Sequence, residues 1–166
     1  MKSYTIRPLC LELSDVAALL AVEQASLSDS NYTAAEALRV LQQPEHWVYL
    51  ACADRQVVGF CFCFATTSDG GQRLEVDMLG VAPAHRRRGL ATRLITYAVA
   101  QAQEGGLADC RAMVATDNVA SRTAFQRSGF TVAGHATPLV YDIGGHRPIA
   151  FLPAGWRWPG AVRRDV

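Results

Sequence analysis

The sequence lacks any run of about 18 apolar residues, the length that an α-helix needs to cross a bilayer. Its first residues, Met1-Lys2-Ser3-Tyr4, also lack the apolar core of a secretory signal peptide. An excess of charge of one sign is missing too, because 16 lysines and arginines face 15 aspartates and glutamates, with a formal net charge of +1. We therefore expect a cytoplasmic protein that binds neither a membrane nor nucleic acid.

Cysteines in a pairing pattern are also absent. The five cysteines form an odd set, Cys10, Cys52, Cys61, Cys63 and Cys110, and most of them lie in predicted strands. The Cys61-Phe62-Cys63 segment has no matching Cys or His pair, which a zinc site would need. The pattern indicates buried thiols in a reducing compartment and no bound metal.

No internal repeat or low-complexity segment is visible either. Half of the 166 residues are hydrophobic and 19% are charged, a composition that is typical of a globular chain with a buried core. We expect residues 1–155 to form a single domain. Residues 156–166, which include Trp156 and Trp158, are expected to form an irregular C-terminal tail.

The stretch from Leu74 to Gln103 combines a strand pattern, a basic turn and a helix pattern. Residues 74–81 are short and apolar-rich, and Ala82-Pro83 ends them because proline cannot continue a β-ladder. From Gly89 onward, apolar residues recur at helical spacing until two glycines end the pattern. The sequence therefore predicts a strand, a turn and an amphipathic helix in direct succession.

The turn in this stretch has the composition of an anion-binding site. The first amides of a helix have no intrahelical partner and the helix dipole is positive there, so a diphosphate can bind. Gly89 allows a close approach or a positive φ, and the arginines at positions 86–88 add favourable charge. An ordinary solvated basic turn is the alternative interpretation.

Two motifs resemble the signatures of a known family. Arg86-Arg87-Arg88-Gly89-Leu90-Ala91 resembles the R/Q-x-x-G-x-G/A signature of the GNAT superfamily of N-acetyltransferases, and Val81-Ala82-Pro83 resembles the V-x-P before it. Residues 118–130, NVASRTAFQRSGF, resemble the family's N-x-x-[AS]-x-x-x-[YF]-x-x-x-G-F helix and follow in the expected order and distance. The resemblance implies an acetyl-CoA-dependent N-acetyltransferase, with acetyl-CoA as cosubstrate.

The other elements fit this fold. Strand patterns cover residues 4–9, 47–53, 57–65, 110–114, 131–141 and 147–152, and helix patterns cover residues 16–22, 34–41 and 118–128. Ser14-Asp15 is expected to cap the first helix and Thr33 with Glu36 the second, while residues 66–72 are predicted as a loop. The order β-α-α-β-β-β-α-β-α-β-β predicts a mixed α/β domain. The resemblance implies one GNAT-like mixed sheet of about seven strands flanked by about four helices.

The resemblance also implies where the coenzyme binds. In GNAT proteins the strand that here ends at Val81 diverges from the strand at residues 110–114, and the pantetheine arm lies between them. The main chain of Val81 would pair with this arm, the amide of Leu79 at a strand bulge would polarise the thioester carbonyl, and Asn118 would hydrogen-bond near the thioester. The implied coenzyme-binding set is Leu79, Val81, Arg86, Arg87, Arg88, Gly89, Leu90, Ala91, Thr92, Asn118 and Phe125.

Acetyl transfer to an amine needs a base, because an alkyl ammonium with a pKa near that of lysine, about 10, is protonated at neutral pH. Glu75 and Asp77 are the candidates, since residues i and i+2 of a strand share one face. Several GNAT enzymes carry a base at the position of Glu75, acting directly or through water, and Asp77 is the second choice. Alternatively, both carboxylates line a solvated sheet edge.

The leaving thiolate has no obvious proton donor. Phe125 lies where many family members have a tyrosine, and a phenylalanine cannot donate a proton. The thiolate would leave unassisted, or water or Tyr141 would protonate it. His85 is predicted to be a surface residue of the basic turn. The alternative function is a non-catalytic acyl-CoA-binding module.

The acceptor is expected to be a primary amine of a small molecule or a peptide. In the family, the helix-loop-helix near the N-terminus forms one wall of the acceptor pocket, which makes Asp29, Asn31 and Tyr32 candidate contacts by position alone. An ordinary solvated connection is an equal alternative for these residues. A monomer and a homodimer are both compatible with the sequence.

Overall fold

The computed structural model describes residues 3–27 and 32–135. These residues form five strands and four α-helices: β1 (Tyr4–Pro8), α1 (Leu13–Leu27), α2 (Ala34–Leu41), β2 (His46–Ala53), β3 (Gln56–Ser68), β4 (Gly71–Val81), α3 (Leu90–Glu104), β5 (Asp109–Ala112) and α4 (Val119–Arg127). A single turn of 3-10 helix, η1 (Pro83–His85), follows β4. This order agrees with the sequence prediction as far as α4.

The strands form one sheet in the order β1-β2-β3-β4-β5. Neighbouring strands are antiparallel from β1 to β4, whereas β4 and β5 are parallel. A parallel pair needs a crossover connection, which α3 provides. The predicted hairpin of the second and third strands is confirmed, and its ladder is irregular beside Gly59, where the sequence predicts a bulge or a close approach.

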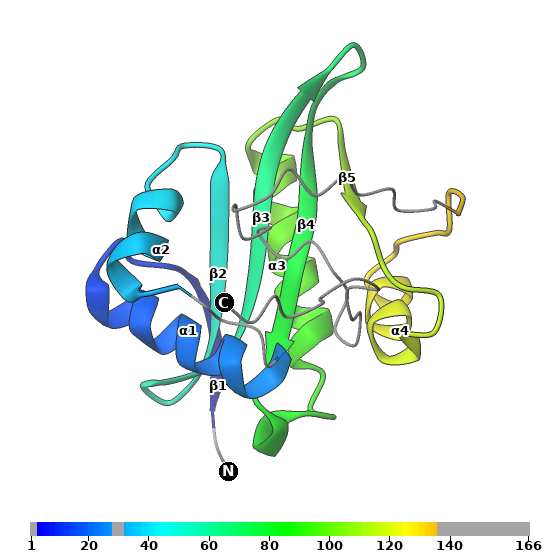
Figure 1. Ribbon diagram of the computed structural model, residues 1–166. Coiled ribbons are helices and arrows are strands. Elements are labelled where there is room, and N and C mark those ends of the chain that lie inside the picture. Colours follow the sequence, from blue (N-terminus) through cyan, green and yellow to red (C-terminus); the bar gives the residue numbers. More distant parts are fainter. Residues whose placement is uncertain (1–2, 28–31, 136–166) are drawn as a thin grey trace, which may run out of the picture.

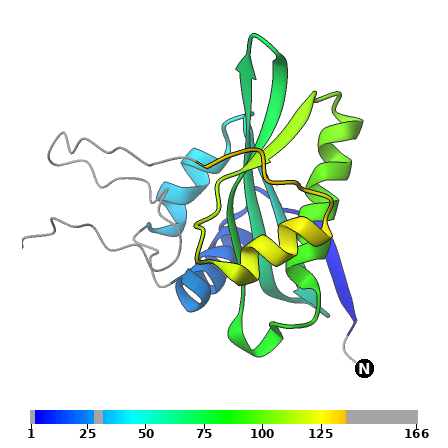
Figure 2. The same cartoon turned by 90° about the vertical axis from the view of Figure 1, so that its right-hand side faces the viewer.

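Helices cover both faces of the sheet, with α1 and α2 on one side and α3 and α4 on the other (Figures 1 and 2). Leu50 and Phe60 are fully buried in the core shared with α1 and α2. Leu74 and Leu94 are fully buried in the core shared with α3 and α4. The predicted mixed α/β fold is therefore confirmed. None of the helices within the described residues has the length and apolar character that a membrane crossing requires.

The predicted count of seven strands is not what the described residues show. The last predicted hairpin spans residues 131–141 and 147–152, and residues 131–135 are irregular rather than extended into a strand. The remainder of that hairpin, and the predicted tail at residues 156–166, lie outside the described residues. The sheet of the described residues thus has five strands.

The predicted loop at residues 66–72 is wrong for most of its length. The β3–β4 ladder continues from Thr66 to the pair Ser68 and Gly71, so only Asp69 and Gly70 connect the strands. Threonines favour extended backbone. The φ of 107° at Gly71 supplies the positive-φ conformation that a tight reversal needs.

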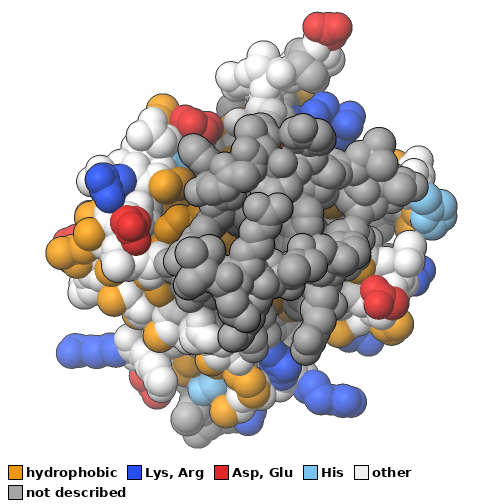
Figure 3. Space-filling model, in the orientation of Figure 1, with side chains coloured by type: hydrophobic (Ala, Val, Ile, Leu, Met, Phe, Trp, Pro, Cys, Tyr) orange, Lys and Arg blue, Asp and Glu red, His pale blue; other side chains and the backbone are white. Residues whose placement is uncertain are grey.

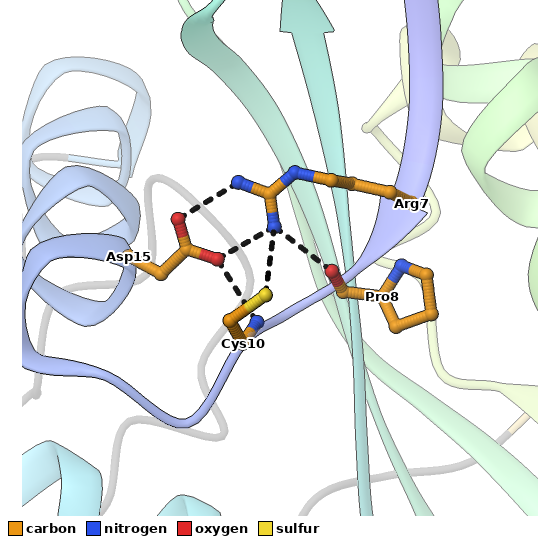
Figure 4. A network of polar contacts seen from close by, with 4 residues as sticks. All are labelled: Arg7, Pro8, Cys10 and Asp15. Atoms are coloured by element: carbon orange, nitrogen blue, oxygen red, sulfur yellow. Dashed lines mark hydrogen bonds and ion pairs between the residues drawn. The ribbon is translucent and has the colours of Figure 1, made fainter.

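The predicted cap of the first helix is also wrong. Helix α1 begins at Leu13, and Asp15 in its first turn accepts hydrogen bonds from Arg7 Nη1 at 2.6 Å and Nη2 at 2.7 Å (Figure 4). The backbone amide of Cys10 also donates to this carboxylate, at 2.9 Å. The hydrogen bonds from Arg7 lower the pKa of Asp15 to about 2. Asp15 therefore ties β1 to α1.

The second helix begins as predicted. The Thr33 hydroxyl accepts a hydrogen bond from the amide of Glu36, and the Glu36 carboxylate accepts one from the amide of Thr33. This reciprocal pair is a capping box that satisfies amides at the start of α2. Both helices that cover one face of the sheet are thus held at their first turns by side chains.

Candidate functional site

The site begins at an irregularity in the middle of β4. Strand β3 pairs Phe62 with Met78 and Cys63 with Val76, so Asp77 has no partner across the ladder and forms a bulge. The family resemblance predicts a bulge at Leu79, and the structure shows it two residues earlier. Val76 packs in the α3–α4 core and Met78 in the α1–α2 core, although residues two apart in a regular strand share one face. The extra residue, Asp77, therefore reverses the alternation of side chains along β4.

The parallel pairing of β4 with β5 ends next to this bulge. Their parallel pairing ends at Val76 and Ala112, while β4 continues to Val81. β5 itself ends at Ala112, two residues before the end of the predicted strand, and the divergence of the two strands stays a prediction. Among the described residues, the stretch of β4 from Asp77 to Val81 has a strand partner only on its β3 side.

The backbone of this stretch faces the gap beside it. The amide of Ala82 donates to Val58 O in β3 at 2.9 Å, so the preceding carbonyl, that of Val81, points to the opposite side. Since the register is regular from Leu79 to Val81, the amide and carbonyl of Leu79 point the same way. In the structure, Val81 O accepts a hydrogen bond from Arg86 Nε at 3.0 Å.

The chain then reaches the start of α3. Gly89 is its N-cap with a φ of 73°, and no side chain caps the helix. The first backbone bond of the helix runs from Arg93 N to Gly89 O at 3.0 Å, and the amides of residues 87–92 have no hydrogen-bond acceptor in the described part of the chain. Arg87 also has a positive φ, of 58°. Successive free amides in such a turn form an anion-binding concavity.

This turn is anchored to the first strand. His85 is buried, and its Nδ1 lies 3.2 Å from the Tyr4 hydroxyl. Arg93 Nη2 donates to Tyr4 O at 2.8 Å. The prediction that His85 lies on the surface is therefore wrong, because the 3-10 turn directs its ring onto β1. Arg86, Arg87 and Arg88 are exposed.

The two predicted base carboxylates have different surroundings. The Glu75 carboxylate forms an ion pair with Arg73 Nε at 2.5 Å. Asp77 is half-buried, and within the described residues no hydrogen bond or ion pair reaches its carboxylate. Burial, together with the neighbouring charge of Glu75, raises the pKa of Asp77 to about 6. The pKa of Asp77 thus lies closer to neutral pH than that of an ordinary aspartate.

Arginines on this face of the sheet are residues that the sequence analysis did not single out. Strand β5 packs Cys110 and Ala112 into the α3–α4 core, which directs Arg111 and Asp109 to the opposite face. In the parallel ladder Arg111 lies beside Glu75. Arg73 could have been found from the sequence, because it lies two residues before Glu75, directly before the predicted strand. Arg111 could not, because its position beside Glu75 depends on how β5 pairs with β4.

Other predicted site residues have structural contacts. Asn118 caps α4 by accepting a hydrogen bond from the amide of Ser121 at 3.1 Å. Phe125 is buried and stacks edge-on against Phe130, with ring centroids 5.0 Å apart. The backbone carbonyl of Thr92 accepts a hydrogen bond from the Ser128 hydroxyl at 3.4 Å. Tyr32 is exposed, whereas Tyr141, Asp29 and Asn31 lie outside the described residues.

The surface hollows of the described residues lie elsewhere. One of about 200 Å³ and one of about 500 Å³ share His46 and Val48 in β2, and neither is lined by Asp77 or Gly89. Basic side chains are visible along the lower margin in Figure 3, the margin where Figure 1 shows the turn between β4 and α3.

Solved structures of several acetyltransferases share this fold. An aminoglycoside acetyltransferase from an uncultured soil metagenomic sample, in complex with trehalose, superposes with a TM-score of 0.77 at 16% identity, covering 84% of this chain and 96% of its own. The ribosomal-protein-alanine N-acetyltransferase of Brucella melitensis gives 0.68 at 20% identity, covering 84% and 100%. An aminoglycoside N-acetyltransferase, AAC(6')-Iy, in complex with CoA, gives 0.73 at 17% identity, covering 85% and 96%.

One curated relative is closer in sequence. It is a protein of Streptomyces avermitilis named as an uncharacterized N-acetyltransferase, and it is 34% identical over 97 residues. The match covers 57% of this chain and 21% of the relative, so the chain spans about a fifth of that relative's length.

The family assignment follows from a match that covers most of the site. The model of the acetyltransferase (GNAT) family matches residues 14–130, which contain the β4 bulge, the paired strands β4 and β5 and the amides at the start of α3. This chain therefore belongs to the GNAT family of acyltransferase enzymes.

Proposed function

We propose that this chain transfers the acetyl group of acetyl-CoA to a primary amine of a small molecule or peptide by direct attack. The observation that supports this most is the run of amides at residues 87–92, which have no hydrogen-bond acceptor among the described residues and follow the unpaired edge of β4. The edge at Leu79 and Val81 suits the amides of a pantetheine arm, and the amides of residues 87–91, with the Thr92 hydroxyl, suit a pyrophosphate.

Arg86 takes part in coenzyme binding in this proposal. Its guanidinium lies against Val81 O and also donates to Ser26 O at 3.3 Å. A pantetheine amide that bonds to the Val81 carbonyl competes with Arg86 for it. Release of Arg86 places a positive charge near the pyrophosphate amides, together with Arg87 and Arg88.

Asp77 is the proposed base. Its carboxylate takes a proton from the bound ammonium, directly or through water, and leaves a free amine. The amine nitrogen attacks the thioester carbonyl carbon, and the amide of Leu79 donates to the oxygen as negative charge develops. The C–N bond forms, the C–S bond then breaks, and the second nitrogen proton goes to the thiolate. Glu75, held by Arg73, tunes Asp77 through its charge.

The leaving thiolate does not use Phe125, which is apolar and buried. A thiol has an ordinary pKa of about 8.5, so a CoA thiolate can depart near neutral pH without a dedicated acid. The alternative, a non-catalytic acyl-CoA-binding module, rests on the same observation, because Phe125 lacks the hydroxyl with which a tyrosine would protonate the thiolate. Release of free thiol from acetyl-CoA in the presence of a broad panel of amines decides for catalysis, and its absence across the panel decides for the module.

A substitution at Gly89 tests the coenzyme site. Gly89→Glu places bulk and negative charge at the proposed pyrophosphate site, and we expect acetyl-CoA affinity in calorimetry to fall at least about 100-fold. Gly106→Glu is the matched control, because Gly106 has the same φ of 73°, open space around it and a position at the other end of α3. Gly89→Gln separates bulk from charge. Wild-type affinity in Gly89→Glu would contradict the proposal.

A further inference from the structure

The neighbours of Asp77 on β4 include side chains on the face of the sheet that α1 and α2 cover. Phe62 and Met78 on this face are covered by the α1–α2 core. Beyond them, Glu75 lies between Phe64 of β3 and Arg111 of β5 in register, and Arg73 and Asp109 form the next row. An amine that binds Asp77 would therefore lie close to these side chains.

Most carboxylates in this region are already neutralised. Glu75 is paired with Arg73 at 2.5 Å, and Asp109 lies 3.7 Å from the Arg111 guanidinium. On the neighbouring helices, Asp15 is bonded to Arg7 and Glu36 forms the α2 capping box. Asp77, in contrast, has no hydrogen bond or ion pair to another described residue.

The rest of the chain supplies no surplus of negative charge. Residues 28–31 and 136–166 contain three aspartates and no glutamate, against four arginines: Asp29, Asp142, Asp165, Arg147, Arg157, Arg163 and Arg164. A molecule with several ammonium groups needs several carboxylates to balance its charge. Beside Asp77, Glu75 and Asp109 already have arginine partners, so Asp77 is the neighbouring strand carboxylate that remains for an ammonium group.

Arg111 supplies a positive charge near the carboxylate of Asp77. Its side chain is 58% exposed, and its ion pair with Asp109, at 3.7 Å, is too long for a hydrogen bond, so the carboxylate of an acceptor can compete with Asp109 for the guanidinium. It lies across the ladder from Glu75, which is two residues along β4 from Asp77. A guanidinium at this position suits a carboxylate a few bonds from the reacting amine.

We propose that the acceptor, under the acetyl transfer proposed above, carries a single primary ammonium group with a carboxylate a few bonds away, recognised by Asp77 and Arg111. Free amino acids and short peptides with an acidic residue at the amino end both have this chemistry. Polyamines and aminoglycosides, which carry several ammonium groups, are disfavoured, although the fold is shared with aminoglycoside acetyltransferases.

The test measures acceptor binding to the CoA-saturated protein by calorimetry, and thiol release from acetyl-CoA in parallel. The panel contains glycine, β-alanine and 4-aminobutyrate, the amide of each, the dipeptide Asp-Ala amide with Ala-Ala amide, spermidine and kanamycin. We expect each carboxylate to bind about 10-fold or more tightly than its amide, because a hydrogen-bonded charge pair is lost in the amide. The amino acids and dipeptides separate the two sources of this chemistry.

Two variants link the preference to Arg111. In Arg111→Glu the preference for the carboxylate over the amide should disappear or reverse. Arg55→Glu, the same charge change in the exposed turn between β2 and β3, should leave the preference intact. Tighter binding of spermidine or kanamycin than of every carboxylate, or an unchanged preference in Arg111→Glu, would overturn the inference. Selective binding without any thiol release would support it while contradicting catalysis.

Discussion

Asp77 combines three properties that are separate in most surface carboxylates. It is half-buried, it has no hydrogen bond or ion pair within the described residues, and it lies at the bulge next to which the pairing of β4 with β5 ends. Burial disfavours the charged form and raises its pKa to about 6, so the group is ionised at pH 7 and yet basic enough to accept a proton. Perturbed carboxylates of this kind gather at functional sites.

Removal of this carboxylate tests its role. We expect Asp77→Asn to lower kcat about 10²–10⁴-fold, the usual contribution of a general base, with acetyl-CoA affinity unchanged. Steady-state kinetics with the best acceptor, combined with calorimetry of acetyl-CoA, measures both quantities. A wild-type kcat in Asp77→Asn would remove this residue from the mechanism.

The pH dependence distinguishes Asp77 from Glu75. A base must be unprotonated, so kcat should fall as pH drops below about 6, the pKa of Asp77. The charge of Glu75 raises this pKa, and Glu75→Gln should therefore shift the decline to lower pH while preserving kcat at pH 8. If Glu75 were itself the base, Glu75→Gln would lower kcat at pH 8 as well.

At the scale of elements, local signals were reliable where a segment supplies its own partners. The capping box of Thr33 and Glu36 and the helix after Gly89 could be predicted because their contacts lie within one turn. The start of α1 could not be predicted, because Asp15 bonds to Arg7 in the preceding strand instead of capping its own helix. The position of the β4 bulge depends on the register with β3, which no local pattern encodes.

The Arg7–Asp15 contact should stabilise the packing of β1 on α1. Its carboxyl pKa is lowered to about 2 in the fold, below the ordinary value of 3.8, so its stabilisation is complete above about pH 4 and is lost as pH falls toward 2. Because Arg7 is partly exposed, we expect Asp15→Asn to reduce the free energy of unfolding by about 1–2 kcal/mol at pH 7. Denaturant unfolding at pH 7 and pH 2.5 measures this.

The control for this contact is Asp69→Asn, at the exposed tip of the β3–β4 hairpin. It removes the same charge at a position without a described ion pair, so its effect should stay within about 0.5 kcal/mol. At pH 2.5 the difference between Asp15→Asn and the wild type should shrink, because the wild-type carboxyl is then partly protonated. An equal loss at both pH values would indicate a packing defect instead of a lost ion pair.

At the scale of the whole molecule, motif spacing predicted the order of the elements as far as α4 and the turn between β4 and α3. It did not predict what holds that turn. Tyr4 and His85 are 81 residues apart in the chain and meet at 3.2 Å, and Arg93 bonds to the carbonyl of the same tyrosine. Such contacts follow from the path of β1 beside β2, and that path is a property of the assembled sheet. The difference between the surroundings of Glu75 and Asp77 had the same origin, since it depends on the burial of Asp77 and on the contact of Glu75 with Arg73.

Binding of the coenzyme should stabilise this assembly as a unit. The proposed site joins the β4 edge to the α3 amides, and these belong to one core, so a ligand that binds only the folded state stabilises the domain by about 2.7 kcal/mol at 100 times its Kd. For a domain of this size that raises Tm by roughly 5–10 °C. Thermal unfolding with acetyl-CoA should show this shift in the wild type and in Gly106→Glu. Gly89→Glu should show none, and a shift of equal size in that variant would mean that the coenzyme binds elsewhere on the molecule.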